Sequence, residues 1–526
     1  MCAWVYDVSL KLSAMATKKT SKKKAVQSEK TKATNRTASA TQPLGKPSIR
    51  LDWSKLLSTK RVRGLYGLSS STPIAGDLRS EFDHDYGRTV FSTPVRRLQD
   101  KAQVFPLERH DAVRTRLTHS MEVSSVARSL GEKAEQFLFK CGDLTLDSQR
   151  GSLGTIAATC GLIHDLGNPP FGHSGESSIR EWFRTQHKAD SHFFDDFKAY
   201  TNASNPKPED TQFAQDFLRF EGNAQTQRLL SRLQVLADEY GLNLTCGTLS
   251  ASCKYVAQSN TIDKGQQERK KHGYFASEND LISKIRAEVG TDDLRNPIAY
   301  LVEASDDIVY STVDLEDGVK KGVITWQFIE DQLLGQLGEH NPNLNEALNR
   351  AREKIEPARL VGRGRDEAMA VAFRTFAIGQ MVVETFREFE KQYSSIMSGS
   401  YHDELLNGSA AGALATECKR LGSEVVYVSG ETLKLELMGR RVITDLLTCF
   451  WEAARIYSPG KKLEGFPAKA YALISTNYRQ IFEKNIAEAK TLGNPDAHFR
   501  MLLITDQVSG MTDSYACSLH RELMNA

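Results

Sequence analysis

The spacing of apolar residues predicts helices along most of the chain after residue 50. Between residues 115 and 139, apolar side chains recur every three or four positions, the pattern of a helix with one buried face. Residues 153–167, LGTIAATCGLIHDLG, form a more uniformly apolar helix that ends at Gly167 and is followed by Asn168-Pro169-Pro170. The predicted face of the first helix carries Leu117, Met121, Val126, Leu130, Ala134, Phe137 and Leu138. The same spacing predicts helices at 220–241, 297–322, 366–392, 440–456, 467–490 and 505–525.

Alternating strand patterns are rare by comparison. Residues 423–430, SEVVYVSG, are the best candidate for a strand. Residues 185–212 lose the helical period and are expected to form an insertion or a long loop. We therefore predict an all-α fold with at most minor β-structure.

Charged residues are unevenly distributed, with an excess of basic residues near the N-terminus. The chain has 526 residues and a formal net charge of only +2. Residues 15–47 nevertheless hold nine basic residues and one acidic residue, with few large apolar side chains. Such a segment cannot bury enough surface to fold, so residues 1–48 are predicted to be a disordered basic tail. The tail either increases solubility or attaches the protein weakly to nucleic acid or another polyanion.

Cysteine usage and hydropathy narrow the class of protein further. The eight cysteines form no CxxC pair and show no spacing typical of a disulfide or zinc framework. Reduced thiols in a cytoplasmic protein are therefore expected. Since no apolar run is long enough to span a bilayer, we expect no membrane partner.

A His-Asp pair stands at the end of the most apolar helix. His164 and Asp165 would be costly to bury there without a partner, and a divalent metal ion satisfies both groups. The helix break at residues 167–170 lets the chain turn back and brings His173 and Glu176 near. These two are three residues apart and can share a helical face.

Further polar positions on apolar helices complete a candidate ligand set. His119 lies on the first amphipathic helix, and Asp306, Tyr310 and Asp314 recur every four residues on one face of another. Alone, a residue like His119 is more often a core or capping histidine, and one like Asp306 is more often part of a solvated helix turn. Together with the His-Asp pair they give two histidines and two carboxylates, which suits Mn, Fe, Mg or a similar metal. The set is His119, His164, Asp165 and Asp306.

Five stretches of the sequence resemble, in order, those of a known family. They are RRLQDKAQVFPLERHDAVRTRLTHSMEV, GLIHDLGNPPFGHSGE, FEGNAQTQRLL, ASDDIVYSTVDLED and DQVSGMTDSYA. They are similar to HD-domain deoxynucleoside triphosphate triphosphohydrolases of the bacterial deoxyguanosine triphosphatase-like branch, over roughly residues 50–520. The resemblance implies an HD-domain helical fold with additional C-terminal helices. Its expected parts are an HD catalytic core at 49–330 and a C-terminal helical region at 331–526 packed on that core.

The resemblance also implies an activity. Family members hydrolyse deoxynucleoside triphosphates to deoxynucleoside and tripolyphosphate with one divalent metal ion per site. We expect dGTP to be preferred and Mn²⁺, Mg²⁺ or a similar ion to serve. A homo-oligomer such as a hexamer is expected, and single-stranded DNA or another nucleic acid is a candidate partner.

Matching positions assign roles to individual residues. His119, His164, Asp165 and Asp306 match the family's metal ligands, and His173 and Glu176 match its catalytic pair. A protonated His173, oriented by Glu176, can donate a proton to the leaving 5′-oxygen. Arg116, Lys254 and Lys271 match residues near the phosphates, and Tyr310 matches the residue under the deoxyribose. The expected substrate contacts are Gln103, Arg116, Asn223, Lys254, Tyr255, Lys271, Tyr310 and Asp314.

Two other functions stay open from the sequence. One is an HD phosphohydrolase that acts on other nucleotides, which would release phosphate or pyrophosphate instead of tripolyphosphate. The other is a nucleic-acid-binding regulator on an inactive HD scaffold, suggested by the basic tail. The intact set of candidate ligands favours an enzyme.

Overall fold

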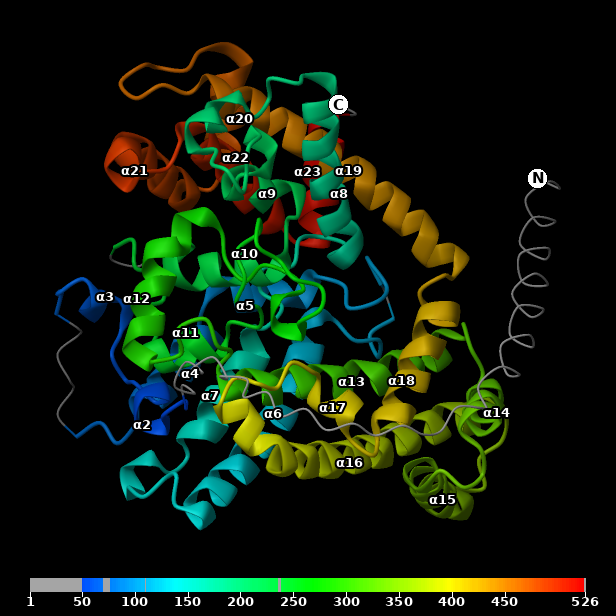
Figure 1. The fold of residues 1–526 in the computed structure, drawn as a ribbon. Coiled ribbons are helices and arrows are strands. Elements are labelled where there is room, and N and C mark those ends of the chain that lie inside the picture. The colour runs from blue at the N-terminus through cyan, green and yellow to red at the C-terminus, as the bar shows by residue number, and fades with distance from the viewer. Residues whose placement is uncertain (1–49, 70–75, 109, 235–237, 525–526) are drawn as a thin grey trace, which may run out of the picture. The chain divides into compact units, whose positions relative to one another are not determined.

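The apolar helix that precedes the His-Asp pair is α7 (Ser152–Ile163), and it is buried along its whole length. In the computed structural model, α6 (Arg116–Cys141), α13 (Pro297–Lys321) and α4 (Glu81–Val90) pack around it (Figure 1). Because α7 is covered on all sides, its sequence needs no polar face. Because its surroundings are buried, His164 and Asp165 at its end would be costly to bury without partners.

The structure describes residues 50–69, 76–108, 110–234 and 238–524. Within these ranges β-structure is limited to three isolated bridges, so the all-α prediction is confirmed. The tail predicted at 1–48 lies outside the described residues.

The other helices are α2 (Trp53–Leu56), α3 (Val62–Leu65), α5 (Thr93–Arg97), α8 (Gly172–Ala189), α9 (Gln212–Leu218), α10 (Gly222–Arg228), α11 (Cys246–Ala251), α12 (Asn279–Val289), α14 (Trp326–Leu337), α15 (Pro342–Ile355), α16 (Gly362–Met397), α17 (Leu405–Gly408), α18 (Gly412–Leu421), α19 (Gly430–Ile456), α20 (Gly465–Leu473), α21 (Thr476–Leu492), α22 (Asp496–Ser509) and α23 (Asp513–Met524).

Both helices that face α7 have well-defined ends. The Thr115 side chain caps α6, and Gly142 ends the helix in the left-handed conformation. Asn296 caps α13 directly before Pro297, and Gly322 ends it in the same left-handed way. Defined ends fix the register of both helices and hence the side chains that they direct toward α7.

The buried face of α6 differs in part from the predicted one. Met121 is 58% exposed, so its place on the buried face was wrong. Instead, small residues face α7: the Ser124 hydroxyl donates to the carbonyl of Ala158 at 2.7 Å. A Cβ atom on Gly161 would lie 2.8 Å from the Ser124 Cα atom, so the backbones approach closely. Close approach, rather than apolar volume, decides which face of α6 is buried.

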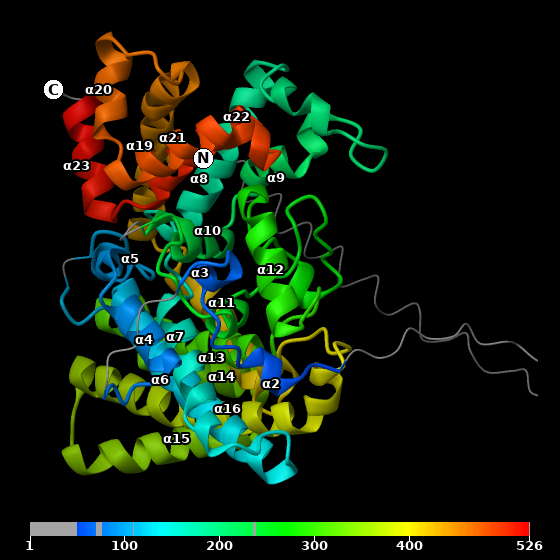
Figure 2. The ribbon, with the colours of Figure 1, turned by 90° about the vertical axis from the view of Figure 1, so that its left-hand side faces the viewer.

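Two hydrophobic clusters meet beside the His-Asp pair. One is built on α8, α19 and α21–α23, in the upper part of Figures 1 and 2, and the other on α6 and α13–α16 below. α7 runs from one into the other, since Cys160 belongs to the lower cluster and Leu162 to the upper. Residues 331–526 contribute to both clusters, and the domain division at residue 330 stays a prediction.

The predicted strand at 423–430 was wrong. Gly422–Val426 continue α18 as a single π-helical turn, and α19 begins at Gly430. Val426 is buried against α13, where its side chain lies beside Gly318. The alternating residues therefore pack one side chain onto a helix instead of pairing with another strand.

Several predicted segments were right in type but wrong in length. The helix at 467–490 is broken at Ser475, the one at 505–525 is broken at residues 510–512, and the one at 220–241 leaves the helical path after Leu233. In the segment at 185–212, α8 continues to Ala189 and two short 3-10 helices follow. Its aromatic residues Phe194 and Phe197 are buried in the upper cluster, which anchors the segment.

Two expectations from composition concern the thiols and the membrane. The cysteines of the described residues are all free, and four of them are buried: Cys160, Cys246, Cys253 and Cys418. Within the described ranges, no helix combines the length and the apolar character needed to cross a bilayer.

A buried ion-pair cluster ties α10 to α22. Arg228 donates to both Asp506 carboxylate oxygens at 2.7–3.1 Å and to Glu278 Oε1 at 2.9 Å. All three side chains are buried. Removing the arginine would leave two buried carboxylates without their cation, a change that typically costs several kcal/mol.

We therefore expect Arg228→Met to lower the free energy of unfolding by about 3–5 kcal/mol. Urea and thermal unfolding followed by circular dichroism measure the change. The control is Arg441→Met, which removes an exposed pair with Asp445 and should cost at most about 1 kcal/mol. Equal losses in the two variants would contradict the importance of the buried cluster.

Candidate active site

Three helices direct the predicted metal ligands to one point. His119 lies in the first turn of α6, His164 and Asp165 directly follow α7, and Asp306 lies midway along α13. The Asp306 Oδ1 atom is 3.1 Å from His119 Nε2 and 3.4 Å from His164 Nε2. His164 Nε2 is also 3.5 Å from Asp165 Oδ2. The structure thus brings together four side chains that lie far apart in the sequence.

The orientation of these side chains fits a metal ion. His164 Nδ1 lies 2.7 Å from the carbonyl of Gly161 and donates to it, so Nε2 is the ring atom that faces the carboxylates. That Nε2 atom is buried and makes no hydrogen bond to the described residues. The Asn168 amide donates to Asp165 Oδ1 at 2.7 Å, which leaves Oδ2 facing His164. One ligand atom from each of His119, His164 and Asp165 lies within 4.8 Å of the others, so this group can hold a metal ion.

The electrostatics of this cluster also favour a cation. Burial opposes a charge on His164, but Asp165 and Asp306 outweigh it and raise the pKa of the imidazole to about 9. Arg116 Nη1 donates to Asp165 Oδ2 and Nη2 donates to the carbonyl of Ala102 at 2.8 Å. The two carboxylates therefore favour positive charge at this point, and in this structure Arg116 supplies part of that charge.

The glycines of the HDLGNPPFGHSGE stretch permit close contacts. A Cβ atom on Gly167 would lie 2.1 Å from the carbonyl oxygen of Gly222, and one on Gly222 would lie 2.2 Å from Asn168 Oδ1. A side chain at position 167 would clash with the backbone, and one at position 222 would displace the side chains of Asn168 and Glu176. The two glycines let the loop after α7 press against the start of α10, which places α8 beside the ligand cluster.

The predicted catalytic pair lies at the start of α8. His173 Nδ1 is 3.0 Å from Glu176 Oε2, and the backbone N–H of Gly222 donates to Glu176 Oε1 at 2.8 Å. The His173 side chain is 84% exposed, whereas that of Glu176 is 2% exposed. The hydrogen bond to Glu176 and its charge raise the pKa of His173. A buried carboxylate thus orients an accessible imidazole and favours its protonated form.

The predicted phosphate contacts surround one aromatic ring. The Nζ atoms of Lys254 and Lys271 both lie 5.9 Å from the centroid of the Tyr255 ring. Lys271 also forms a 2.9 Å ion pair with Glu221, which accepts a 2.7 Å hydrogen bond from Asn223. Glu221 is buried and was not predicted, although it stands in the FEGNAQTQRLL stretch. The signal that could have found it is its place in that stretch, two residues before Asn223.

The predicted sugar contacts lie further along α13. The Tyr427 hydroxyl donates to Asp314 Oδ2, while Asp314 Oδ1 is buried without a hydrogen bond to the described residues. Lys419 Nζ lies 5.1 Å from the centroid of the Tyr310 ring. Gln103 Oε1 is also buried without a described partner. Neither Gln103 nor Asp314 hydrogen-bonds to the metal-binding group in the described part of the chain.

Tyr427 and Lys419 were not predicted as site residues from the sequence. Both come from the region of α18 and the turn after it, more than a hundred residues away from the α13 residues that they contact. Tyr427 lies in the stretch predicted as a strand, and no short motif marks either residue as part of a site. Only the tertiary fold shows that they lie beside the predicted sugar contacts.

The C-terminal DQVSGMTDSYA stretch supports the loop after α7. Asp513 accepts hydrogen bonds of 3.0 Å from the backbone N–H groups of Phe171 and Ala102. Lys101, which is buried, donates to the carbonyls of Asn168 and Ser509. One carboxylate and one ammonium thus join the chain before Gln103 to the loop before His173.

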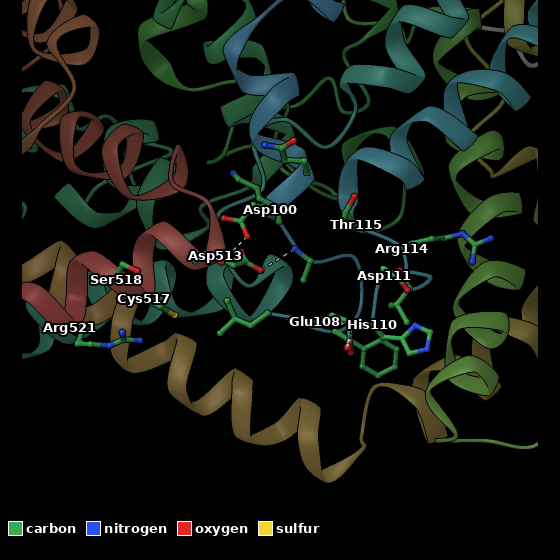
Figure 3. Close-up of a pocket in the computed structure, with 17 residues that line it drawn as sticks. Asp100, Glu108, His110, Asp111, Arg114, Thr115, Asp513, Cys517, Ser518 and Arg521 are labelled. Atoms are coloured by element: carbon green, nitrogen blue, oxygen red, sulfur yellow. Dashed lines mark hydrogen bonds between the residues drawn. The ribbon is translucent and has the colours of Figure 1, made fainter.

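A cavity of about 480 Å³ lies beside this support. Its lining includes Asp100, His110 and Thr115 on one side and Asp513, Cys517 and Arg521 of α23 on the other, and none of the predicted metal ligands lines it (Figure 3). The predicted ligand cluster and catalytic pair therefore lie outside this cavity.

Helices that place two histidines and two aspartates around one point define an HD-domain hydrolase. Residues 116–225 match the HD domain family model. A deoxyguanosinetriphosphate triphosphohydrolase-like protein of Listeria innocua serovar 6a is 39% identical over 490 residues, which cover 90% of this chain and 99% of the relative. The protein of the same name from Synechocystis is 31% identical, with the same coverage of both chains. The deoxyguanosinetriphosphate triphosphohydrolase of Yersinia enterocolitica is 30% identical over 90% of this chain and 99% of the relative.

The chain therefore belongs to the deoxyguanosinetriphosphate triphosphohydrolase-like family of HD-domain proteins, and it is a phosphohydrolase. The family resemblance inferred from the five sequence stretches is confirmed. The roles of the individual site residues stay predictions.

Proposed function

We propose that this protein hydrolyses deoxynucleoside triphosphates to deoxynucleoside and tripolyphosphate in a metal-dependent reaction. The observation that carries the proposal is the convergence of His119, His164 and Asp165 with Asp306, beside the His173–Glu176 pair. The printed names of the relatives support a deoxynucleotide substrate and suggest dGTP as the preferred one.

In this proposal His119, His164, Asp165 and Asp306 hold one divalent ion, such as Mn²⁺ or Mg²⁺. When bound, the ion supplies charge stabilisation at the α-phosphate and lowers the pKa of a nucleophilic water. The ligands are held in place by the protein itself, since Gly161 orients His164 and Asn168 orients Asp165.

His173 and Glu176 then supply the proton that the leaving group needs. Attack of water on the α-phosphorus breaks the bond between this phosphorus and the 5′-oxygen. The α-, β- and γ-phosphates leave together as tripolyphosphate. Protonated His173 donates its proton to the departing 5′-oxygen, so that the neutral deoxynucleoside leaves. Glu176 keeps the imidazole protonated and turned outward before the reaction.

The charges around the site suit an anionic substrate. Arg116, Lys254 and Lys271 would neutralise the triphosphate, each leaving a carboxylate that it contacts in this structure. Tyr310 would lie against the deoxyribose, where its ring would clash with a 2′-hydroxyl. Asp314 and Gln103 would form hydrogen bonds with the sugar hydroxyl.

The homo-oligomer, the nucleic-acid partner and the cytoplasmic location are further predictions from the family resemblance.

The decisive experiment incubates the purified protein with each of four dNTPs and four NTPs and Mg²⁺, Mn²⁺ or Co²⁺. We expect deoxynucleoside and tripolyphosphate in equal amounts from dNTPs, with dGTP fastest, when products are separated by anion-exchange chromatography. Release of orthophosphate or pyrophosphate would favour an HD phosphohydrolase of another specificity. Equal rates with NTPs would remove the proposed role of Tyr310.

A further inference from the structure

A buried ion pair lies behind the Lys254 ammonium group. Arg295 Nη1 donates to Glu303 Oε2 at 2.7 Å, and the two side chains are 0% and 3% exposed. The guanidinium also lies over the ring of Tyr300, 4.5 Å from the ring centroid. Glu303 stands one turn before Asp306 on α13, so the two carboxylates share a face of the helix.

The other oxygen of Glu303 faces Lys254. The Lys254 Nζ atom is 3.8 Å from Glu303 Oε1 and 3.8 Å from Asp306 Oδ2. The ammonium group therefore sits between two carboxylates that are one helical turn apart. Asp306 turns its second oxygen toward the two imidazoles of the metal-binding group. Lys254 is thus placed directly beside the candidate metal site, with Glu303 on its other side.

Stability alone explains this pair poorly. Replacing a buried ion pair by neutral side chains of similar size is often neutral for stability, because desolvating two charges offsets their attraction. Arg295 also keeps two buried N–H groups, at Nε and Nη2, without hydrogen bonds to the described residues. What the pair does provide is a fixed carboxylate: one oxygen of Glu303 is held by Arg295, and the other faces Lys254 and Gln267.

We propose that Glu303, held by Arg295, is a positioning residue that fixes the Lys254 ammonium at the phosphate end of the site. This inference rests on the proposed function, in which Lys254 contacts the triphosphate. A lysine side chain has several rotatable bonds, and an unrestrained one must be ordered when the substrate binds. Loss of the pair should therefore weaken substrate binding more than it slows the chemical step.

The test removes the pair without changing the net charge. In the double variant Arg295→Met/Glu303→Gln, the attraction of the site for an anionic substrate is kept and only the restraint on Lys254 is lost. We expect KM for dGTP to rise about tenfold while kcat stays within about threefold. In a Lys254→Met background the same double change should leave KM unaltered, because the restrained group is gone.

A control removes an ion pair elsewhere whose carboxylate is mostly buried and whose arginine is half-exposed. Glu330 on α14 is mostly buried and pairs with Arg352, and the double variant Arg352→Met/Glu330→Gln should leave KM and kcat unchanged. If the first double variant fails to fold, Glu303→Gln alone is compared in the wild-type and Lys254→Met backgrounds, and its effect on KM must vanish in the second. An unchanged KM, or the same rise in both backgrounds, would overturn the inference. Absence of tripolyphosphate from every dNTP in the unmodified protein would overturn the proposed function instead.

Discussion

Asp306→Ala should lose both the bound metal ion and the turnover of dNTP. Asp306 Oδ1 contacts both imidazoles of the candidate site, at 3.1 Å from His119 Nε2 and 3.4 Å from His164 Nε2. Its removal takes away one of two carboxylates and leaves two imidazoles and the single charge of Asp165, a donor set with a weaker hold on a divalent ion. Because the metal contributes several kcal/mol to a phosphoryl transition state, kcat should fall by about 10³-fold or more.

Metal binding has a readout that is independent of activity. A ligand that binds only the folded protein raises its melting temperature, so Mn²⁺ should stabilise the wild-type protein. In Asp306→Ala this stabilisation should disappear, while the melting temperature without metal shows whether the variant is folded. Asp331→Ala, at an exposed position of α14, is the control and should keep both properties. An Asp306→Ala protein that still binds Mn²⁺ and hydrolyses dGTP would refute the ligand assignment.

The members of the candidate site could be found from the sequence where they interrupt a regular pattern. His164 and Asp165 follow a helix of buried residues, and Asp306 interrupts the apolar side of α13. A polar group at such a position needs a partner, and this need is visible without a structure. The identity of the partner is not, because the distance from His119 to Asp306 depends on how α6 and α13 cross α7.

Residues that reach the site through tertiary contacts could not be predicted. Tyr427 donates to Asp314 from a turn that the sequence pattern assigned to a strand. Asp513 supports the loop before His173 from more than three hundred residues away. Met121 shows the same limit within one helix: the period predicts that a face is buried, but close backbone contact with α7 selects which one.

Glu176→Gln should keep the metal ion and lose most of the rate. The substitution preserves the size of the side chain and an oxygen that can accept from the Gly222 N–H, so α8 should keep its place. It removes the negative charge that favours protonated His173. General acid catalysis typically contributes about 10²–10⁴-fold, and kcat should fall within that range. The Mn²⁺-induced rise in melting temperature should persist, which separates this variant from Asp306→Ala.

The pH profile tests the mechanism behind that loss. The general acid must be protonated, so the rate falls as pH rises through the pKa of His173. Glu176 raises this pKa through its hydrogen bond and charge, and its neutral replacement should lower it again. The alkaline limb of the kcat profile should therefore move to lower pH in Glu176→Gln. Glu181→Gln is the control on the same helix, since its exposed carboxylate pairs with Arg440 away from His173. A lower rate with an unshifted alkaline limb would mean that Glu176 acts on the structure of α8 and not on the proton of His173.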